Sequence, residues 1–291
     1  MVDIGIIGGG SLGLLIGSFL KENYNLTIYV RRDEQANQLR TYGINRATTK
    51  RKVNALHYND MKQEDLMIVC LKQYDIESVI SFINQTNQET PIVFLQNGMG
   101  HLELLDMMQQ PTIVGVVEHG AYRLNDYTVE HTGKGSIKIA PYQTARQITN
   151  KIKEILQTTN FPILVSDDWK SMLIEKLIVN AVINPLTAIF NVKNGELLTN
   201  KSLYELFKLL TYETAKILQL NGQEQLERVE KIAYLTQSNY SSMVQDIQTT
   251  GRTEIEAISG YLYQQVKKKE SIPYTSFVYH GVRALERIDL R

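Results

Sequence analysis

The sequence predicts two architectures in one chain: an α/β part built on a doubly wound, mostly parallel sheet, followed by an all-α part. Short apolar β-runs alternate with helix-length segments as far as Ser166, and only helical patterns follow that residue. At 291 residues the chain is long for one hydrophobic core and of ordinary length for two domains. We therefore place a domain boundary at Ser166 and expect domains over residues 1–166 and 167–291.

The composition excludes several classes of partner. The 31 basic and 31 acidic residues cancel and form no Lys/Arg block, so we expect no nucleic-acid partner. Cys70 is the single cysteine, which rules out an internal disulfide and fits a reducing cytoplasm, and no histidine has a second His or Cys at metal-ligand spacing. A strand-like segment follows Met1 and Val2 directly, without a basic leader, and the most apolar runs, Leu12–Leu20 and Leu177–Phe190, are too short or too interrupted to span a bilayer. We expect a cytoplasmic protein without a bound metal.

The first element is an apolar strand, Asp3–Ile7, followed at once by a glycine-rich turn and a helix to about Lys21. In a GxGxxG turn the first glycine allows the sharp turn, the second lets backbone approach a pyrophosphate, and the third lets helix pack on strand. A second β-run, Leu26–Val30, follows at the expected distance, which disfavours the alternative of a merely glycine-rich turn. The pattern predicts a Rossmann-type dinucleotide site formed by Gly8, Gly9, Gly10, Ser11, Leu12 and Gly13.

Two arginines end the second strand, where an NAD site carries an acidic residue that binds the ribose hydroxyls. Arg31 and Arg32 stand at that point, and a guanidinium there favours a 2′-phosphate through charge-assisted contacts. The competing acids, Asp33 and Glu34, lie where the next helix is expected to begin, a position favoured by the helix dipole. We therefore expect NADP(H), bound through Arg31, with Arg32 as the alternative.

Further strands place polar residues at the same edge of the sheet. Leu66–Leu71 is a buried-type strand that ends at Lys72, and Pro91–Leu95 precedes Asn97. Because the carboxyl ends of parallel strands meet at the ligand crevice, we expect Lys72 and Asn97 beside the cofactor. The alternative for Lys72 is a solvated charge at a strand end.

The remaining β-runs suggest an antiparallel addition to the sheet, because short strands follow one another across Gly or Asn-Asp turns. A helix with one face formed by Ile148, Ile152 and Ile155 then leads to a last strand. The predicted strands are Thr112–Val117, Ala121–Leu124, Tyr127–Glu130, Ser136–Ile139 and Pro162–Val165.

The sequence predicts only helices in the C-terminal part. The first of them begins at Trp169 and is expected to break at Pro185. This helix carries Lys176, Asn180 and Asn184 at four-residue spacing, so they form one polar stripe on an otherwise apolar surface. Buried amides and ammonium groups require partners, which are either neighbouring helices or a ligand. The other predicted helices are Ser202–Leu220, Gln223–Thr236, Ser241–Ile247, Thr253–Lys269 and Tyr274 to the end.

Two further polar groups stand in this part. One contains Asn239, Ser241, Ser242 and Asp246, and the other follows Gly251, where Thr253 can cap a helix whose first turn holds Glu254 and Glu256. As first-turn acids the two glutamates could serve only the helix dipole.

Taken together, these segments resemble those of the ketopantoate reductases over nearly the whole length of the chain. The resemblance rests on segments that stand in the same order: GxGxxG from Gly8, QNGMG from Gln96, KLIVNAVINPLTAI from Lys176, NGE from Asn194, and SSMVQD from Ser241 followed by TEIEAISGYL. It implies an NADPH-dependent 2-dehydropantoate 2-reductase of the route to pantothenate and coenzyme A.

The resemblance also implies roles for single residues. Lys176 would be the proton donor and Glu254 its essential companion, while Arg31 and Lys72 would contact the cofactor phosphates. Glu118 and His119 depart from the small hydroxyl residues of many relatives, and so put details of the cofactor pocket in doubt. The substrate would be bound by Asn97, Asn180, Asn184, Asn194, Asn239 and Ser242.

The residues themselves support this chemistry. An ammonium aimed at the ketone oxygen stabilises the charge that develops there and delivers the proton, and a nearby carboxylate keeps that ammonium charged against burial. Two alternatives remain open: a reductase of another 2-keto acid, and a non-catalytic NADP(H) sensor. The sequence is equally compatible with a monomer and a homodimer.

Overall fold

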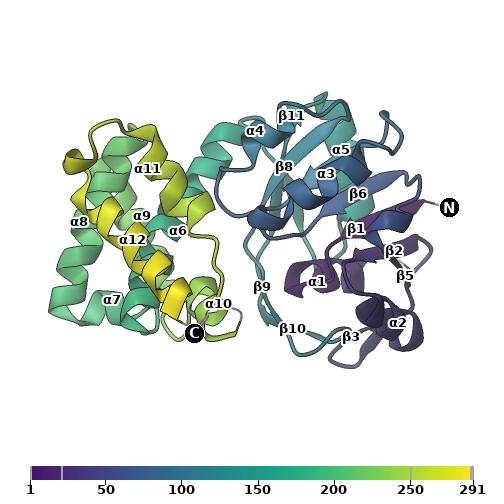
Figure 1. The fold of residues 1–291 in the computed structure, drawn as a ribbon, viewed down its shortest axis with the longest axis horizontal. Coiled ribbons are helices and arrows are strands. Elements are labelled where there is room, and N and C mark those ends of the chain that lie inside the picture. The colour runs from purple at the N-terminus through teal and green to yellow at the C-terminus, as the bar shows by residue number, and fades with distance from the viewer. Residues whose placement is uncertain (1, 21, 250, 289–291) are drawn as a thin grey trace. The chain divides into compact units, whose positions relative to one another are not determined.

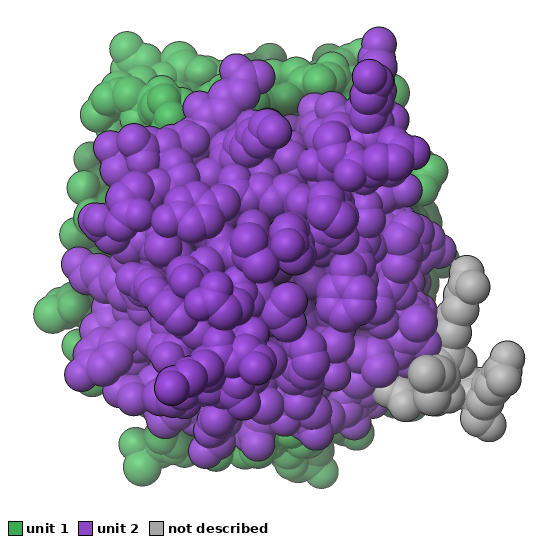
Figure 2. Space-filling model, turned by 90° about the vertical axis from the view of Figure 1, so that its left-hand side faces the viewer, with its two compact units in different colours: residues 1–96, 101–172 green, residues 97–100, 173–291 purple. Residues whose placement is uncertain are grey.

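The computed structural model describes residues 2–20, 22–249 and 251–288. Its elements follow one another as labelled in Figure 1. The chain divides into two compact units, which Figure 2 distinguishes by colour. Unit 1 contains residues 1–96 and 101–172, and unit 2 contains residues 97–100 and 173–291. The short segment 97–100 therefore belongs with the C-terminal unit.

Unit 1 is built on an eight-stranded sheet in the order β12-β11-β8-β7-β6-β1-β2-β5. All neighbouring strands are parallel except β8 and β11. The chain leaves β1 toward β2 on one side and returns to β6 on the other, so the strand order reverses between β1 and β6. The strands are β1 (Asp3–Ile7), β2 (Asn25–Val30), β5 (Asn54–His57), β6 (Leu66–Val69), β7 (Ile92–Phe94), β8 (Thr112–Val117), β11 (Ile137–Gln143) and β12 (Ile163–Val165).

Helices and two small hairpin sheets complete unit 1. The predicted antiparallel addition is confirmed for β11 on β8, whereas β9 (Gly120–Arg123) and β10 (Val129–Gly133) pair only with each other. The second hairpin, β3 (Ile44–Arg46) with β4 (Thr49–Arg51), was not predicted. The helices are α1 (Ser11–Phe19), α2 (Asp33–Tyr42), α3 (Glu77–Ile83), α4 (Leu102–Leu105) and α5 (Arg146–Leu156), with short 3₁₀ turns η1 (Tyr58–Asp60) and η2 (Gln73–Asp75).

The core of unit 1 explains why the central strands coincide with apolar runs in the sequence. Ile4, Ile6, Ile28 and Ile68 come from adjacent central strands and are wholly shielded from solvent, as is Leu14 from α1. Strands buried on both faces read as continuous apolar runs rather than as alternating patterns. This is why the runs in β1, β2 and β6 could be recognised.

The regular elements that the structure describes in unit 2 are all helices, as expected. The long helix α6 (Trp169–Phe190) begins within unit 1 and continues through unit 2. The other elements are α7 (Glu196–Thr199), α8 (Lys201–Ile217), α9 (Gly222–Leu235), α10 (Ser242–Thr249), the π-helix η3 (Glu256–Gly260), α11 (Tyr261–Gln265), the 3₁₀ turn η4 (Lys269–Ser271) and α12 (Pro273–Ile288).

Helix α6 differs from the prediction in one respect: it does not break at Pro185. Proline has no backbone N–H to donate to the carbonyl of Ala181, so the helix lacks one backbone hydrogen bond at this point, yet it continues to Phe190. Thr187 Oγ1 donates to the carbonyls of Ile183 and Asn184 in the same turn, at 2.7 and 3.0 Å. By length and hydropathy α6 could span a membrane, but 67% of its most apolar window is buried inside the protein, as in a core helix.

Candidate functional site

The turn between β1 and α1 has the geometry that a dinucleotide phosphate requires. Gly8 has φ +113°, a region that side chains disfavour, and a Cβ on Gly13 would lie 1.9 Å from the carbonyl oxygen of Gly8. At Gly10 the added atom would meet nothing within 4 Å, and this N-cap residue of α1 leaves the first-turn amides without a side-chain cap. A first turn without a side-chain cap, beside a glycine with room around its Cα, fits the binding of a pyrophosphate.

The sheet topology places this turn at the carboxyl ends of the parallel strands, where doubly wound sheets bind their ligands. Ile7 of β1 pairs with Val69 of β6, so Gly8 and the half-buried Lys72 both follow the carboxyl ends of the two strands between which the order reverses. Ligands of doubly wound sheets bind at that point. The residues present therefore fit the predicted dinucleotide.

The two arginines after β2 have different surroundings. Arg32 forms an ion pair with Asp126, which also accepts from Arg123 Nη1 at 3.3 Å. Arg31 is exposed and forms no hydrogen bond or ion pair with any residue that the structure describes. Asp33 and Glu34 lie in the first turn of α2, as predicted. Arg31 thus has the free guanidinium of the two.

Gln35, in the first turn of α2, contacts the glycine-rich turn and was not predicted from the sequence. Its Nε2 donates to the carbonyl of Gly9 at 2.7 Å and to that of Asp126 at 3.1 Å, and its side chain is buried. A buried glutamine in the first turn of a polar helix has no periodic signature, so only the proximity of the glycine-rich turn could have suggested it. Gln35 holds the turn in place from the side of α2.

In unit 2 the polar stripe of α6 meets a buried carboxylate through Asn97. Asn180 Nδ2 donates to Asn97 Oδ1 at 3.4 Å, and Asn97 Nδ2 donates to Glu254 Oε2 at 3.0 Å. Glu254 is only 5% exposed and Asn180 7%. Lys176 lies one turn before Asn180 and is half-buried. Three predicted site residues from distant parts of the sequence are therefore joined by hydrogen bonds.

Asn184, one turn further along α6, is also 7% exposed. Among the described residues, none forms a hydrogen bond with its side-chain amide. Buried amides are ordinarily hydrogen-bonded, so this one has capacity for a ligand or a water molecule.

Asn194 and Asn239 are brought together at the end of α9. The backbone amide of Asn194 donates to the carbonyl of Asn239 at 3.0 Å, and its Nδ2 donates to Thr236 Oγ1 at 2.8 Å. The Oδ1 atom of Asn194 is buried without a partner among the described residues, whereas Asn239 is exposed. Thr236 is a contributor that the sequence reasoning did not single out.

Ser241 and Ser242 have different positions at the start of α10. Ser241 is buried; its Oγ accepts from the amide of Val244 at 3.3 Å and lies 2.7 Å from Thr187 Oγ1. Ser242 is the first residue of α10 and is exposed. The serine that packs the helix is thus Ser241, which leaves Ser242 accessible to a ligand.

Gly98 fits closely against the π-helix of unit 2. It has φ +77°, and a Cβ there would lie 2.1 Å from the carbonyl oxygen of Ala257. The amide of Met99 donates to that same carbonyl at 3.2 Å. The contact fixes the backbone on either side of Gly98, and with it the position of Asn97.

Glu118 and His119, the departures noted above, belong to an ion-pair and aromatic cluster in unit 1. Glu118 pairs with Lys138 at 3.1 Å, and the His119 ring stacks on Phe161 with centroids 4.4 Å apart. Burial, and then the neighbouring His131, lower the pKa of His119 to about 4. His119 is therefore a neutral packing residue at neutral pH.

Both parts of the chain match known families of proteins. The family model described as ketopantoate reductase PanE/ApbA matches residues 4–144, and the model of that family's C-terminal part matches residues 168–286. The chain belongs to the ketopantoate reductase family. This membership confirms the resemblance inferred from the sequence motifs.

Individual known proteins are similar to this chain over almost their full length. A 2-dehydropantoate 2-reductase of Bacillus subtilis (strain 168) is 40% identical over 98% of each chain. A solved Bacillus subtilis structure, of a probable 2-dehydropantoate 2-reductase, has a TM-score of 0.87 at 37% identity and covers 98% of this chain and 100% of its own. A ternary structure of D-mandelate dehydrogenase with NADH and anilino(oxo)acetate has a TM-score of 0.91 at 22% identity, covering 99% and 100%, and shows a shared fold.

Proposed function

We propose that this chain catalyses the NADPH-dependent reduction of 2-dehydropantoate to pantoate, a step toward pantothenate and coenzyme A. Family membership supports the reaction, and one observation carries its assignment to this site: the hydrogen-bonded series Asn180–Asn97–Glu254, one helical turn from Lys176. A buried carboxylate and neutral amides beside a lysine suit a small, polar keto acid.

In the proposed reaction NADPH supplies the hydride to the carbonyl carbon. The ammonium of Lys176 stabilises the negative charge that develops on the ketone oxygen and transfers a proton to it, so that the ketone becomes a hydroxyl group. Glu254 keeps Lys176 charged, because a buried ammonium without a carboxylate nearby would favour its neutral form. The lysine then regains its proton from solvent.

Neutral side chains orient the substrate in this proposal. Asn184 and Asn194 each have unused amide capacity, and Ser242 has an exposed hydroxyl. Such groups donate and accept without adding a second strong charge, and holding a substrate in a reactive geometry lowers the barrier by reducing the entropy cost. The proposed substrate-binding set is Asn97, Asn180, Asn184, Asn194, Asn239 and Ser242.

The cofactor is assigned to residues of the N-terminal part. Gly8, Gly9, Gly10, Ser11, Leu12 and Gly13 would bind the pyrophosphate, Arg31 the 2′-phosphate and Lys72 a further phosphate oxygen, with Asn97 contributing from its own segment. The division into residues 1–166 for cofactor binding and 167–291 for substrate binding and catalysis belongs to the same proposal.

Substrate preference tests this function directly. Purified protein with NADPH should lose reduced-nicotinamide absorbance on addition of ketopantoate, with kcat/KM higher than for 2-keto acids that lack its hydroxyl group. A higher value for another keto acid would favour the alternative reductase, and no turnover of any would favour an NADP(H) sensor. We further propose that the enzyme acts in the cytoplasm as a monomer or a homodimer, states that light scattering distinguishes.

A further inference from the structure

The segment that carries Glu254 is attached to helix α12 at two points. Thr253, Glu254 and Ile255 are all buried, at 3%, 5% and 0% exposure. Thr253 and Glu256, which lie on either side of Glu254, are both hydrogen-bonded to α12. The two attachments therefore flank the proposed catalytic carboxylate along the chain.

The first attachment is a carboxylate that holds Thr253. Glu286 Oε1 accepts from the backbone amide of Thr253 at 2.6 Å and from its Oγ1 at 2.7 Å. Thr253 Oγ1 in turn accepts from the amide of Ile255 at 3.1 Å, as the sequence led us to expect of a capping residue. Hydrogen bonds to an ionised acceptor are about twice as strong as neutral ones, so Glu286 fixes the backbone immediately before Glu254.

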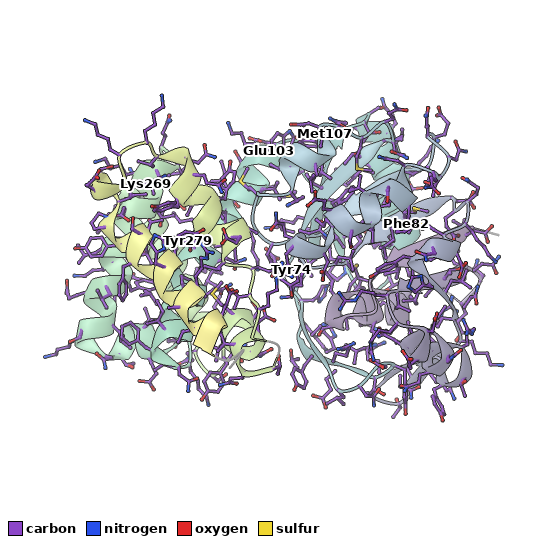
Figure 3. The ribbon with its side chains drawn as sticks, in the orientation of Figure 1. Tyr74, Phe82, Glu103, Met107, Lys269 and Tyr279 are labelled. Atoms are coloured by element: carbon purple, nitrogen blue, oxygen red, sulfur yellow. The ribbon has the colours of Figure 1, made fainter. Side chains whose placement is uncertain are left out.

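The second attachment holds the side chain of Glu256 and is formed in part by Tyr279, which is labelled in Figure 3. Tyr279 Oη donates to the two carboxylate oxygens of Glu256 at 2.8 and 3.0 Å, and Arg283 Nε lies 3.2 Å from one of them. Burial raises the pKa of Tyr279, and its bond to Glu256 raises it further, so this hydroxyl keeps its proton. A Cβ on Gly260 would lie 2.9 Å from the Glu256 carboxylate, so the glycine leaves room for it.

These contacts converge on a rare local conformation. Glu256 opens the π-helix η3, in which the amide of Gly260 donates to the carbonyl of Ile255 at 2.9 Å. Single π-turns are rare and need support from their surroundings. Tyr279, Arg283 and Glu286 stand four and three residues apart on α12, which puts them on one face of that helix.

We propose that Tyr279, Arg283 and Glu286 are positioning residues that form a two-point clamp on residues 253–256 and so hold Glu254 against Asn97. The inference rests on the proposed function, in which Glu254 is the carboxylate that acts on Lys176. None of the three residues belongs to the proposed substrate- or cofactor-binding set. The salt bridge of Arg283 is half-exposed and contributes least, so Glu286 and Tyr279 carry the clamp.

Four variants separate positioning from simple stabilisation of α12. Glu286→Ala and Tyr279→Phe should each lower kcat about 10-fold, since small misplacement of a catalytic group is costly, while the Kd for NADPH stays unchanged. Glu286→Gln should restore most of kcat, because an amide oxygen can accept both Thr253 bonds. Glu213 offers a matched control, since its carboxylate binds the amides of Tyr274 and Thr275 at the other end of α12 and Glu213→Ala should leave kcat unchanged.

A double-mutant cycle with Glu254→Gln decides the question. If the clamp acts through Glu254, adding Glu286→Ala to Glu254→Gln should cause no further loss of kcat. An equal loss of kcat in both backgrounds, or a loss in Glu213→Ala as large as in Glu286→Ala, would overturn the clamp and leave the proposed function standing. Normal turnover of Glu254→Gln alone would overturn the role of Glu254 and the clamp together.

Discussion

Arg31 and Arg32 are neighbours in the sequence, yet among the described residues only Arg32 has an ion-pair partner. The guanidinium of Arg32 is paired with Asp126, and that of Arg31 forms no hydrogen bond or ion pair with the described residues. The sequence could nominate both but could not separate them, because Asp126 lies far along the chain, in the turn between β9 and β10. A long-range ion pair leaves no mark on local sequence.

Cofactor preference follows from this difference. Arg31→Ala should lower the ratio of kcat/KM for NADPH to that for NADH by about 10- to 100-fold, since hydrogen bonds to charged groups contribute about 1.5–3 kcal/mol. Arg32→Ala should change the ratio much less, because its guanidinium already has a partner. Steady-state kinetics with both cofactors measures the effect, and a larger change for Arg32→Ala would reverse the assignment.

Residue types at the proposed substrate site were predictable where they interrupt an apolar helix. Asn180 stands out because amides are rare on a buried helical surface, and its partner Asn97 follows a strand end. Thr187 and Ser241 were not recognised as a pair, since hydroxyl groups bonded to helix carbonyls need no partner elsewhere and carry no periodic signal. Geometry alone revealed that these two residues join α6 to α10.

At the scale of elements, the helix expected over Thr253–Lys269 is interrupted. The π-helix η3 is followed by the short helix α11, and the 3₁₀ turn η4 comes next. A π-turn differs from an α-turn by one residue in its hydrogen bonding, and side-chain propensities do not distinguish the two. The tertiary contacts of Glu256 and Ala257 decide the conformation, which is why the sequence pattern could not.

Gly98 tests the fit between this π-helix and the segment that carries Asn97. Gly98→Ala would place a methyl group 2.1 Å from the carbonyl oxygen of Ala257 in a backbone conformation with φ +77°. The segment must move, so kcat/KM for ketopantoate should fall by about 100-fold while NADPH still binds with its normal Kd. Gly133→Ala is the control, because its nearest contact would be 3.3 Å. Normal kcat/KM in Gly98→Ala would show that Asn97 does not depend on this contact.

At the scale of the whole molecule, each unit has its own buried core. Apolar side chains of the parallel strands and α1 fill unit 1, and those of α6, α8 and α9 fill unit 2. This organisation was predictable, because fully buried strands and amphipathic helices have different apolar periods. The strands between Ile44 and His57 were missed, since they are short and carry polar residues at most positions.

The grouping of residues 97–100 with unit 2 could not be predicted from sequence. These residues follow strand β7 of unit 1, but they contact Asn180, Glu254 and Ala257 of the helical unit. The local sequence pattern predicts the strand that precedes this segment, but it does not indicate which distant residues the segment contacts.

Lys176 supplies the proton in the proposed reduction of ketopantoate, and single-turnover kinetics of Lys176→Ala tests this role most directly. With enzyme in excess and NADPH prebound, the hydride-transfer rate should fall by about 10²- to 10⁴-fold, the range for loss of a general acid, while the Kd for NADPH remains that of the unaltered enzyme. A near-normal rate of NADPH oxidation in this variant would contradict the mechanism.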